Sequence, residues 1–216
     1  ADFHFAPTAL SKKNLTKENI KKNIFIVGNT VIDSVKLITK KFNIENLEKK
    51  NQILVTIHRR EHLLSKLNYI CNELLNIKKK YKNWNVIWPI HPNPKIKKFI
   101  NKKLRNSKNI KIINHLDYLS FLKLVITSKI ICSDSGGIQE EATFLKKKIL
   151  IIRNVTERPE VLKTKNGELV VLKRKLLSKK INSLIKKGNW NVKKNYIFGN
   201  GKTSEKIIAI LKKLKF

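Results

Sequence analysis

The sequence predicts an α/β protein with a Rossmann-like, doubly wound parallel sheet. Along the 216 residues, short apolar runs rich in β-branched side chains alternate with longer segments of helical periodicity. Parallel strands need crossover connections, which are usually helices, so this alternation predicts a parallel sheet wrapped by helices. Polar residues follow the ends of several predicted strands, where ligands of such sheets bind.

The predicted elements follow one another in order. Apolar, β-branched runs predict strands at 23–28, 52–58, 85–91, 109–115, 129–134, 148–153 and 168–172. Helical spacing predicts helices at 31–42, 62–81, 94–104, 118–128, 138–146, 176–187 and 204–214. The opening residues 1–22 have no strong period and are interpreted as an interdomain connector. Residues 23–216 are then one Rossmann-like domain that ends in two helices.

The chain is strongly basic, with 48 Lys and Arg against 15 Asp and Glu and a formal charge of +33. Such a charge attracts polyanions, so a basic nucleic-acid-binding protein is one functional hypothesis. However, nearly all of the basic residues are lysines dispersed along helix-like segments, and Ile and Asn are abundant too. This composition favours genome-wide drift over a dedicated surface, because no recognition motif for DNA or RNA accompanies it.

Cysteine usage and hydropathy predict an intracellular protein. Cys71 and Cys132 lie in apolar or helical stretches and lack the paired spacing of a metal site, so we expect buried thiols, a reducing compartment and no metal. No apolar run approaches the roughly 20 residues of a membrane span, and no signal peptide opens the chain. We therefore expect a cytoplasmic protein without a membrane partner.

The stretch SDSGGIQEE at 133–141 carries the strongest functional signal. A strand that ends before Ser135, Gly136 and Gly137 and continues as a helix leaves backbone N–H groups unpaired at the helix start, where a phosphate fits. A simple capping turn is the alternative. Glu141, about one turn into the helix, favours a nucleotide because it can accept hydrogen bonds from a ribose diol.

Two other strand ends carry histidines. His58 is followed directly by Arg59 and Arg60, and arginines at a sheet rim suit a diphosphate because the guanidinium makes bidentate contacts. His91, in WPIHPNP, has a weaker claim, because the neighbouring prolines can simply shape a loop.

The acidic and basic residues near these turns permit several pairings. In RNVTERPE at 153–160, Glu157 and Arg158 are compatible with a structural ion pair or with a substrate contact, and the residues alone favour neither. Glu140, adjacent to Glu141, is expected to point away into solvent.

Eight collinear stretches together resemble the non-hydrolysing UDP-N-acetylglucosamine 2-epimerase family. They are FHFAPT (3–8), VGNTVIDSV (27–35), VTIHRRE (55–61), WPIHPNP (88–94), LDYLSF (116–121), SDSGGIQEEA (133–142), RNVTERPE (153–160) and NYIFGNGKTS (195–204). The resemblance implies the C-terminal, nucleotide-binding half of a GT-B fold, with the family's N-terminal domain absent from this chain.

The resemblance also implies an activity. Members are isomerases that interconvert UDP-GlcNAc and UDP-ManNAc for cell-surface polysaccharides, by elimination of UDP and re-addition, without cofactor or metal and usually as homodimers. The carboxylates proposed to move the C2 proton belong to the N-terminal domain, so the activity of this chain alone is uncertain. A separately encoded N-terminal domain would complete the enzyme. The alternative is a catalytically inactive UDP-sugar-binding remnant.

The family's site residues carry over to positions that match its motifs. The resemblance implies that His58 is a catalytic-site histidine and that Ser135, Gly136 and Gly137 form a phosphate loop. It also implies that Glu141 binds the ribose, that Arg158 contacts UDP and that Phe121 lies against the uracil. Arg59 and His91 match positions that contact an activating second UDP-GlcNAc in some members. Lys146 departs from the family's usual Gly, which predicts strain at a left-handed helix end.

Overall fold

A six-stranded parallel sheet forms the centre of the molecule, with strand order β5-β4-β3-β6-β7-β8. The computed structural model describes residues 1–57, 64–90, 92–105, 107–173, 175–188, 192 and 194–214. The sheet consists of β3 (Lys50–Thr56), β4 (Asn85–Pro89), β5 (Ile110–Ile113), β6 (Ser128–Ser133), β7 (Lys148–Ile151) and β8 (Gly167–Leu169). The predicted fold class is confirmed.

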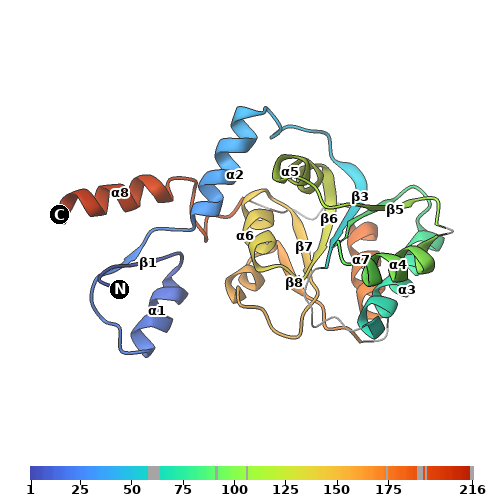
Figure 1. Ribbon diagram of the computed structural model, residues 1–216, viewed down its shortest axis with the longest axis horizontal. Helices are drawn as coiled ribbons and strands as arrows, with labels where there is room; N and C mark the ends of the chain where they lie inside the picture. The colour runs from blue at the N-terminus through green and yellow to red at the C-terminus, as the bar shows by residue number, and fades with distance from the viewer. Residues whose placement is uncertain are drawn as a thin grey trace.

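Helices cover both faces of this sheet (Figure 1). One face packs against α3 (Leu64–Lys80), α4 (Pro94–Leu104) and α7 (Leu176–Lys187). The other packs against α2 (Thr30–Lys41), α5 (Tyr118–Thr127), α6 (Gly136–Phe144) and the 3-10 helix η1 (Pro159–Lys163).

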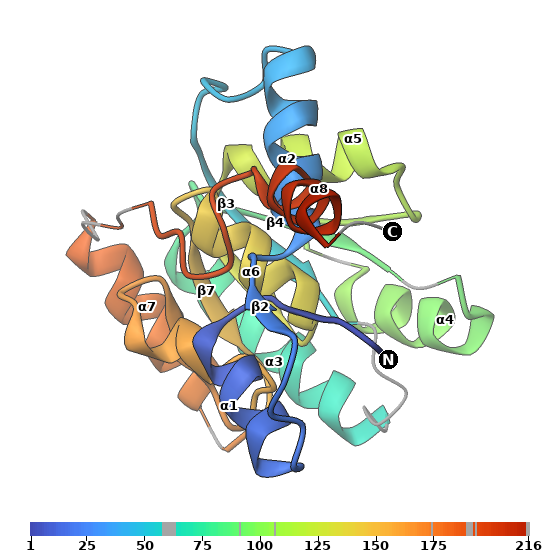
Figure 2. The ribbon, with the colours of Figure 1, turned by 90° about the vertical axis from the view of Figure 1, so that its left-hand side faces the viewer.

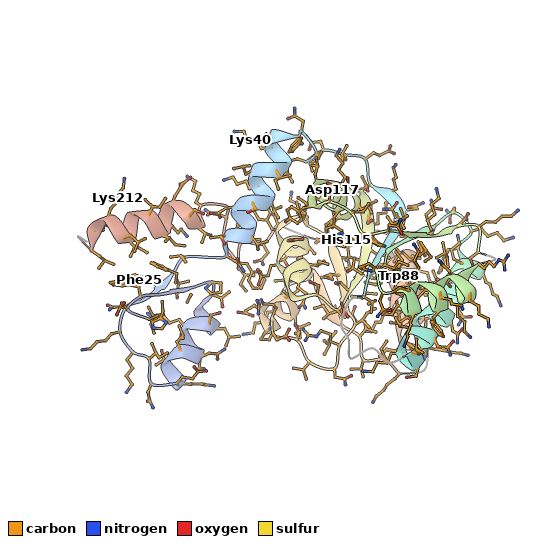
Figure 3. All side chains as sticks on the ribbon, in the orientation of Figure 1. Phe25, Lys40, Trp88, His115, Asp117 and Lys212 are labelled. Carbon is orange, nitrogen blue, oxygen red and sulfur yellow. The ribbon has the colours of Figure 1, made fainter. Side chains whose placement is uncertain are left out.

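Each face has its own apolar cluster, because successive side chains of a strand point to opposite faces. In β3, Ile53 and Val55 belong to one cluster and Leu54 to the other. Trp88 of β4, labelled in Figure 3, is fully buried on the side of α3 and α4. The cysteines Cys71 and Cys132 are also fully buried, and this burial raises the pKa of each thiol to about 12.

A smaller unit projects from one side of the main domain. It contains β1 (His4–Ala6), α1 (Ala9–Lys17), β2 (Ile24–Ile26) and α8 (Thr203–Lys213), and Figures 1 and 2 both place it beyond α2 and α6. The strands β1 and β2 pair in parallel with each other in a separate sheet. The prediction that the run at 23–28 joins the main sheet was wrong, since local periodicity does not specify the partner of a strand. The opening segment, which has no strong period in the sequence and was interpreted as a connector, contains a strand and a helix.

Side-chain contacts attach this projecting unit to the main domain. The Asp33 carboxylate of α2 accepts hydrogen bonds from the backbone amides of Thr203 (2.9 Å) and Ser204 (2.6 Å) at the start of α8. Partial burial raises the pKa of Asp33, but these hydrogen bonds outweigh it and leave the pKa below its usual value. Thr8 Oγ1 donates to Glu160 Oε1 at 2.6 Å and joins the opening segment to η1.

Lys146 lies just after the C-cap of α6, in the left-handed conformation predicted for it, with φ of +57°. Around it, the amide of Lys147 donates to Ala142 O at 2.8 Å and closes the helix end. Glycine adopts this conformation without the clash that Cβ introduces. We therefore expect Lys146→Gly to raise the free energy of unfolding by about 0.5–1 kcal/mol, measured by urea denaturation.

A matched control for this substitution is Lys22→Gly. Lys22 is also exposed, but its φ is not positive, so the substitution relieves no strain and adds chain entropy to the unfolded state. The helix-end explanation is wrong if both substitutions change stability equally.

In the part of the chain that the structure describes, no helix combines the length and apolarity that crossing a bilayer requires.

Candidate functional site

The candidate site lies where the strand order of the sheet reverses. From β3 the chain continues outward through β4 and β5, and it then returns to β6 on the opposite side of β3. The carboxyl ends of β3 and β6 are joined there, because Thr56 Oγ1 donates to Ser133 Oγ at 2.8 Å and the Asp134 amide donates to Thr56 O at 3.3 Å. In open α/β sheets this switch point is the usual ligand site.

The turn after β6 leaves an open helix N-terminus. Ser135 is the N-cap of α6, but its side chain makes no capping hydrogen bond, and its amide donates to Ser133 Oγ at 3.0 Å. Among the described residues, no acceptor is found for the backbone amides of Gly136 and Gly137. Free amides and the helix dipole together favour an anion at this position. The turn therefore has the geometry that the sequence predicts.

Glu141 is buried in the same helix, with only 6% of its surface exposed. Its Oε1 accepts a hydrogen bond from the Tyr118 hydroxyl at 2.9 Å, whereas its buried Oε2 has no partner within the described part of the chain. Burial raises the pKa of Glu141 to about 7; the Tyr118 hydrogen bond lowers it and the charge of Glu140 raises it. An acceptor oxygen without a donor in a buried position is costly, so this atom is suited to a ligand hydroxyl.

Sequence reasoning missed Tyr118. It lies at the start of α5, in the LDYLSF stretch that was interpreted only through Phe121, one turn further along the helix. Its contact with Glu141 joins two helices, so no local pattern reports it; the signal available was a tyrosine next to the Asp117 helix cap. Phe121 itself is half-buried against the cluster of the α5 and α6 face.

The loop after β7 forms two ion pairs. Arg153 pairs with Glu157 through both terminal guanidinium nitrogens, and Arg158 pairs through Nε with Glu140. The ion pair between Glu157 and Arg158, one of the two alternatives that the sequence left open, is therefore not the one that forms. Neighbouring side chains in an irregular loop point apart, and each finds its partner elsewhere.

Glu140 is also not solvated, contrary to prediction. It is only 1% exposed and accepts from both Arg158 and Asn29 Nδ2, the latter at 2.5 Å. All of the residues from Ile138 to Phe144 are buried. Helix α6 has no solvated face because α2, α5 and the 153–158 loop surround it, and sequence periodicity does not reveal that environment.

Three predicted site residues, His58, Arg59 and His91, lie outside the described residues. The described part contains no group of three His, Cys, Asp or Glu side chains that could hold a metal ion.

The described part does contain two cavities at the far end of α6, and both are bordered by Phe144 and Lys194. The Lys194 ammonium lies 4.2 Å from the centre of the Phe144 ring. These cavities are separate from the turn at Ser135 to Gly137.

The sheet, its helices on both faces and the open turn at the switch point define a Rossmann-like domain of the GT-B class. The family model described as UDP-N-acetylglucosamine 2-epimerase matches residues 1–212. The chain therefore belongs to the UDP-N-acetylglucosamine 2-epimerase family.

Individual relatives agree with this assignment. The chain is 38% identical to a UDP-N-acetylglucosamine 2-epimerase of Campylobacter jejuni, over 100% of this chain and 61% of the relative. It is similar in structure to the Neisseria meningitidis UDP-GlcNAc 2-epimerase bound to UDP-GlcNAc, with a TM-score of 0.88, 34% identity, and coverage of 99% of this chain and 62% of that one.

A third similar structure is the Methanocaldococcus jannaschii enzyme in complex with UDP-GlcNAc and UDP, with a TM-score of 0.83, 35% identity, and coverage of 99% of this chain and 61% of that one. The chain thus spans about three-fifths of the length of the relatives that it matches.

Proposed function

We propose that this chain binds the UDP moiety of UDP-GlcNAc and UDP-ManNAc and forms the nucleotide-binding part of a non-hydrolysing UDP-N-acetylglucosamine 2-epimerase, an isomerase. The observation that carries this proposal is the buried Glu141 Oε2, which has no hydrogen-bond partner among the residues that the structure describes. A ribose hydroxyl satisfies it, since a hydroxyl donates one hydrogen bond and a carboxylate accepts. The amides of Gly136 and Gly137, which have no acceptor among the described residues, lie about one helical turn before Glu141 and are proposed to hold the diphosphate of the same ligand.

Each site residue has a role in this proposal. The turn at Ser135 to Gly137 holds the diphosphate, Glu141 holds the ribose, and Phe121 packs against the uracil. Arg158 contacts the diphosphate in this proposal. Two of its guanidinium nitrogens contact the protein, and because the side chain is 37% exposed, part of the guanidinium remains accessible to a ligand. His58 acts beside the diphosphate, and Arg59 and His91 belong to an activator site.

The proposed reaction needs charge stabilisation at this turn. When the bond between C1 and the diphosphate oxygen breaks and a base takes the C2 proton, UDP leaves with the electron pair and a 2-acetamidoglucal forms. Re-addition of UDP to C1 and return of the proton to C2 from the opposite face complete the epimerisation. Preorganised amides at a helix N-terminus stabilise the negative charge as it develops. No metal or cofactor takes part in the proposed route.

The group that moves the C2 proton is proposed to lie in an N-terminal domain that completes the site. The projecting unit is suited to contact such a domain, because it exposes apolar residues such as Ile26 (50%) and Ile208 (53%) on β2 and α8. Figure 3 labels Phe25 and Lys212 on the same unit. We further propose that the complete enzyme is a homodimer in the cytoplasm, where its nucleotide-sugar substrate is available.

Calorimetric titration of the chain with UDP tests the nucleotide-binding proposal. We expect saturable binding that survives physiological salt, because the ribose and uracil contacts are not screened as charge attraction is. Inorganic pyrophosphate and duplex DNA serve as comparisons for the +33 charge. Folded protein that fails to bind UDP, or that binds DNA at physiological salt without preference for UDP, contradicts the proposal.

A second experiment tests whether the proton-transferring group lies outside this chain. The chain alone is expected not to convert UDP-GlcNAc to UDP-ManNAc, and activity should appear when an N-terminal domain of the family is added. Turnover by the isolated chain would show that the proton-transferring group lies within it.

A further inference from the structure

The carboxylate of Glu140 has no role in the proposed nucleotide contacts, yet it is almost completely buried. It lies in α6 just after the first turn, next to Glu141, with 1% of its surface exposed. A buried carboxylate is destabilising unless donors compensate it. Two donors from distant parts of the chain do so: Arg158 Nε contacts Oε1, and Asn29 Nδ2 contacts Oε2 at 2.5 Å.

Neither donor can turn away without loss. Asn29 uses its side-chain oxygen to accept from the Val31 amide at 3.1 Å as the N-cap of α2, so its NH2 group must face Glu140. An amide side chain in place of Glu140 would direct one NH2 group at another donor, whereas a carboxylate accepts at both oxygens. The position therefore requires a carboxylate of this length.

The consequence of this arrangement is an Arg158 guanidinium held in one orientation. Its Nε contacts Glu140, and its Nη1 donates to Glu157 O at 3.2 Å. Its Nη2 has no partner among the described residues, and the side chain is 37% exposed. A planar guanidinium held along one edge presents the remaining N–H groups in a defined direction.

The backbone that carries Arg158 is attached to α6 as well. Thr156 Oγ1 donates to Gln139 Oε1 at 2.7 Å and accepts from the Arg158 amide at 3.0 Å. The same loop passes the open N-terminus of α6, since a Cβ built on Gly136 would lie 4.0 Å from Glu157 Oε2. The loop that carries Arg158 thus passes the turn with the free amides at the neighbouring residue, Glu157.

We propose that Glu140 is a positioning residue that orients the Arg158 guanidinium toward the diphosphate of a nucleotide bound at the α6 N-terminus, an inference that rests on the proposed function. Glu140 contacts no ligand itself. Through Asn29 it also connects the start of α2 to the same arginine.

The test compares the affinities for UDP and uridine in wild type, Glu140→Asp, Arg158→Ala and the double variant. Glu140→Asp keeps the negative charge but withdraws the carboxylate by one methylene, so it tests orientation rather than charge. We expect UDP affinity to fall by about tenfold or more, as for loss of a charge-assisted hydrogen bond, while uridine affinity is unchanged. In the Arg158→Ala background the same substitution should have no further effect.

Glu168→Asp is the matched control, because Glu168 of β8 also pairs with a basic residue, Lys180 of α7, away from this site. It should leave both affinities unchanged. Glu140→Asp with wild-type UDP affinity overturns the proposal. Equal losses for UDP and uridine, or a loss that persists without Arg158, show a general structural role and overturn it too.

If Glu140→Asp does not fold, Arg158→Lys tests the same point. Lysine keeps the positive charge but lacks the Nε through which Arg158 contacts Glu140. Loss of the preference for UDP over uridine is expected, and an unchanged preference overturns the proposal. Wild-type protein that binds no UDP contradicts the proposed function as well, whereas wild-type binding with unaffected variants contradicts this inference alone.

Discussion

Replacing Glu141 by Gln is expected to weaken uridine binding by roughly 10- to 100-fold, the cost of one or two hydrogen bonds to a charged group. Glu141 Oε2 is the unpartnered acceptor proposed for the ribose, and an amide nitrogen at this position donates instead of accepting. Uridine is the ligand of choice because it lacks phosphates that titrate near pH 6. Calorimetry at pH 8 measures the change, and Glu168→Gln is a control without an expected effect.

The same residue predicts a pH dependence. Because the pKa of Glu141 is raised to about 7, the carboxylate becomes protonated below that value and one acceptor site is lost. Uridine affinity should fall as the pH drops below about 7, by up to tenfold per unit. Tyr118→Phe removes the hydrogen bond that lowers this pKa, so it should move the midpoint upward. Uridine affinity that is flat between about pH 5 and 8 would contradict the assignment.

Stability should change in the opposite direction. The folded pKa of Glu141 is raised above its unfolded value, so its contribution to stability is fully present below the unfolded pKa and is lost as the pH rises through about 7. Glu141→Gln should therefore be more stable than wild type at pH 8, with the difference disappearing near about pH 5. A variant that binds uridine poorly yet unfolds at higher urea would indicate a residue retained for function.

Gly28→Ala is expected to lower the free energy of unfolding by about 2–5 kcal/mol, from backbone strain and overpacking together. Gly28 connects β2 to α2 with φ of +101°, a conformation that L side chains rarely adopt. A Cβ there would lie 2.7 Å from Thr203 Oγ1 and 3.0 Å from the Cα of Gly199. Since Gly199 is backbone, it cannot move aside as a flexible side chain could.

Gly188→Ala separates the two causes. Gly188, at the end of α7, also has a positive φ (+66°), but a Cβ there would meet nothing within 4 Å. This variant should cost only about 1–2 kcal/mol, the strain of a sparsely populated backbone conformation with positive φ. Urea denaturation measures the loss of unfolding free energy in both variants. Equal losses would show that the close contacts of a Cβ at Gly28 with Gly199 and Thr203 contribute nothing.

The site was only partly predictable from the sequence. The glycines after β6 and the acid one turn further on are local features, because a helix that follows a strand end must begin with unpaired amides. The partners of Glu140 and Glu141 come from residues far along the chain, at Asn29, Tyr118 and Arg158. A single sequence contains no record of such pairings, and reasoning from neighbours gave a solvated Glu140 and left the partner of Arg158 open.

The fold divides in the same way. The parallel sheet follows from apolar runs separated by helical segments, because burial on both faces and crossover connections are imposed wherever that pattern occurs. The partner of β2 does not follow, since the apolar run Ile24–Ile26 resembles the strands of the main sheet and yet pairs with β1 in a separate sheet. Local periodicity thus determined which segments are strands and helices, whereas long-range packing decided which strands pair and which buried carboxylates find donors.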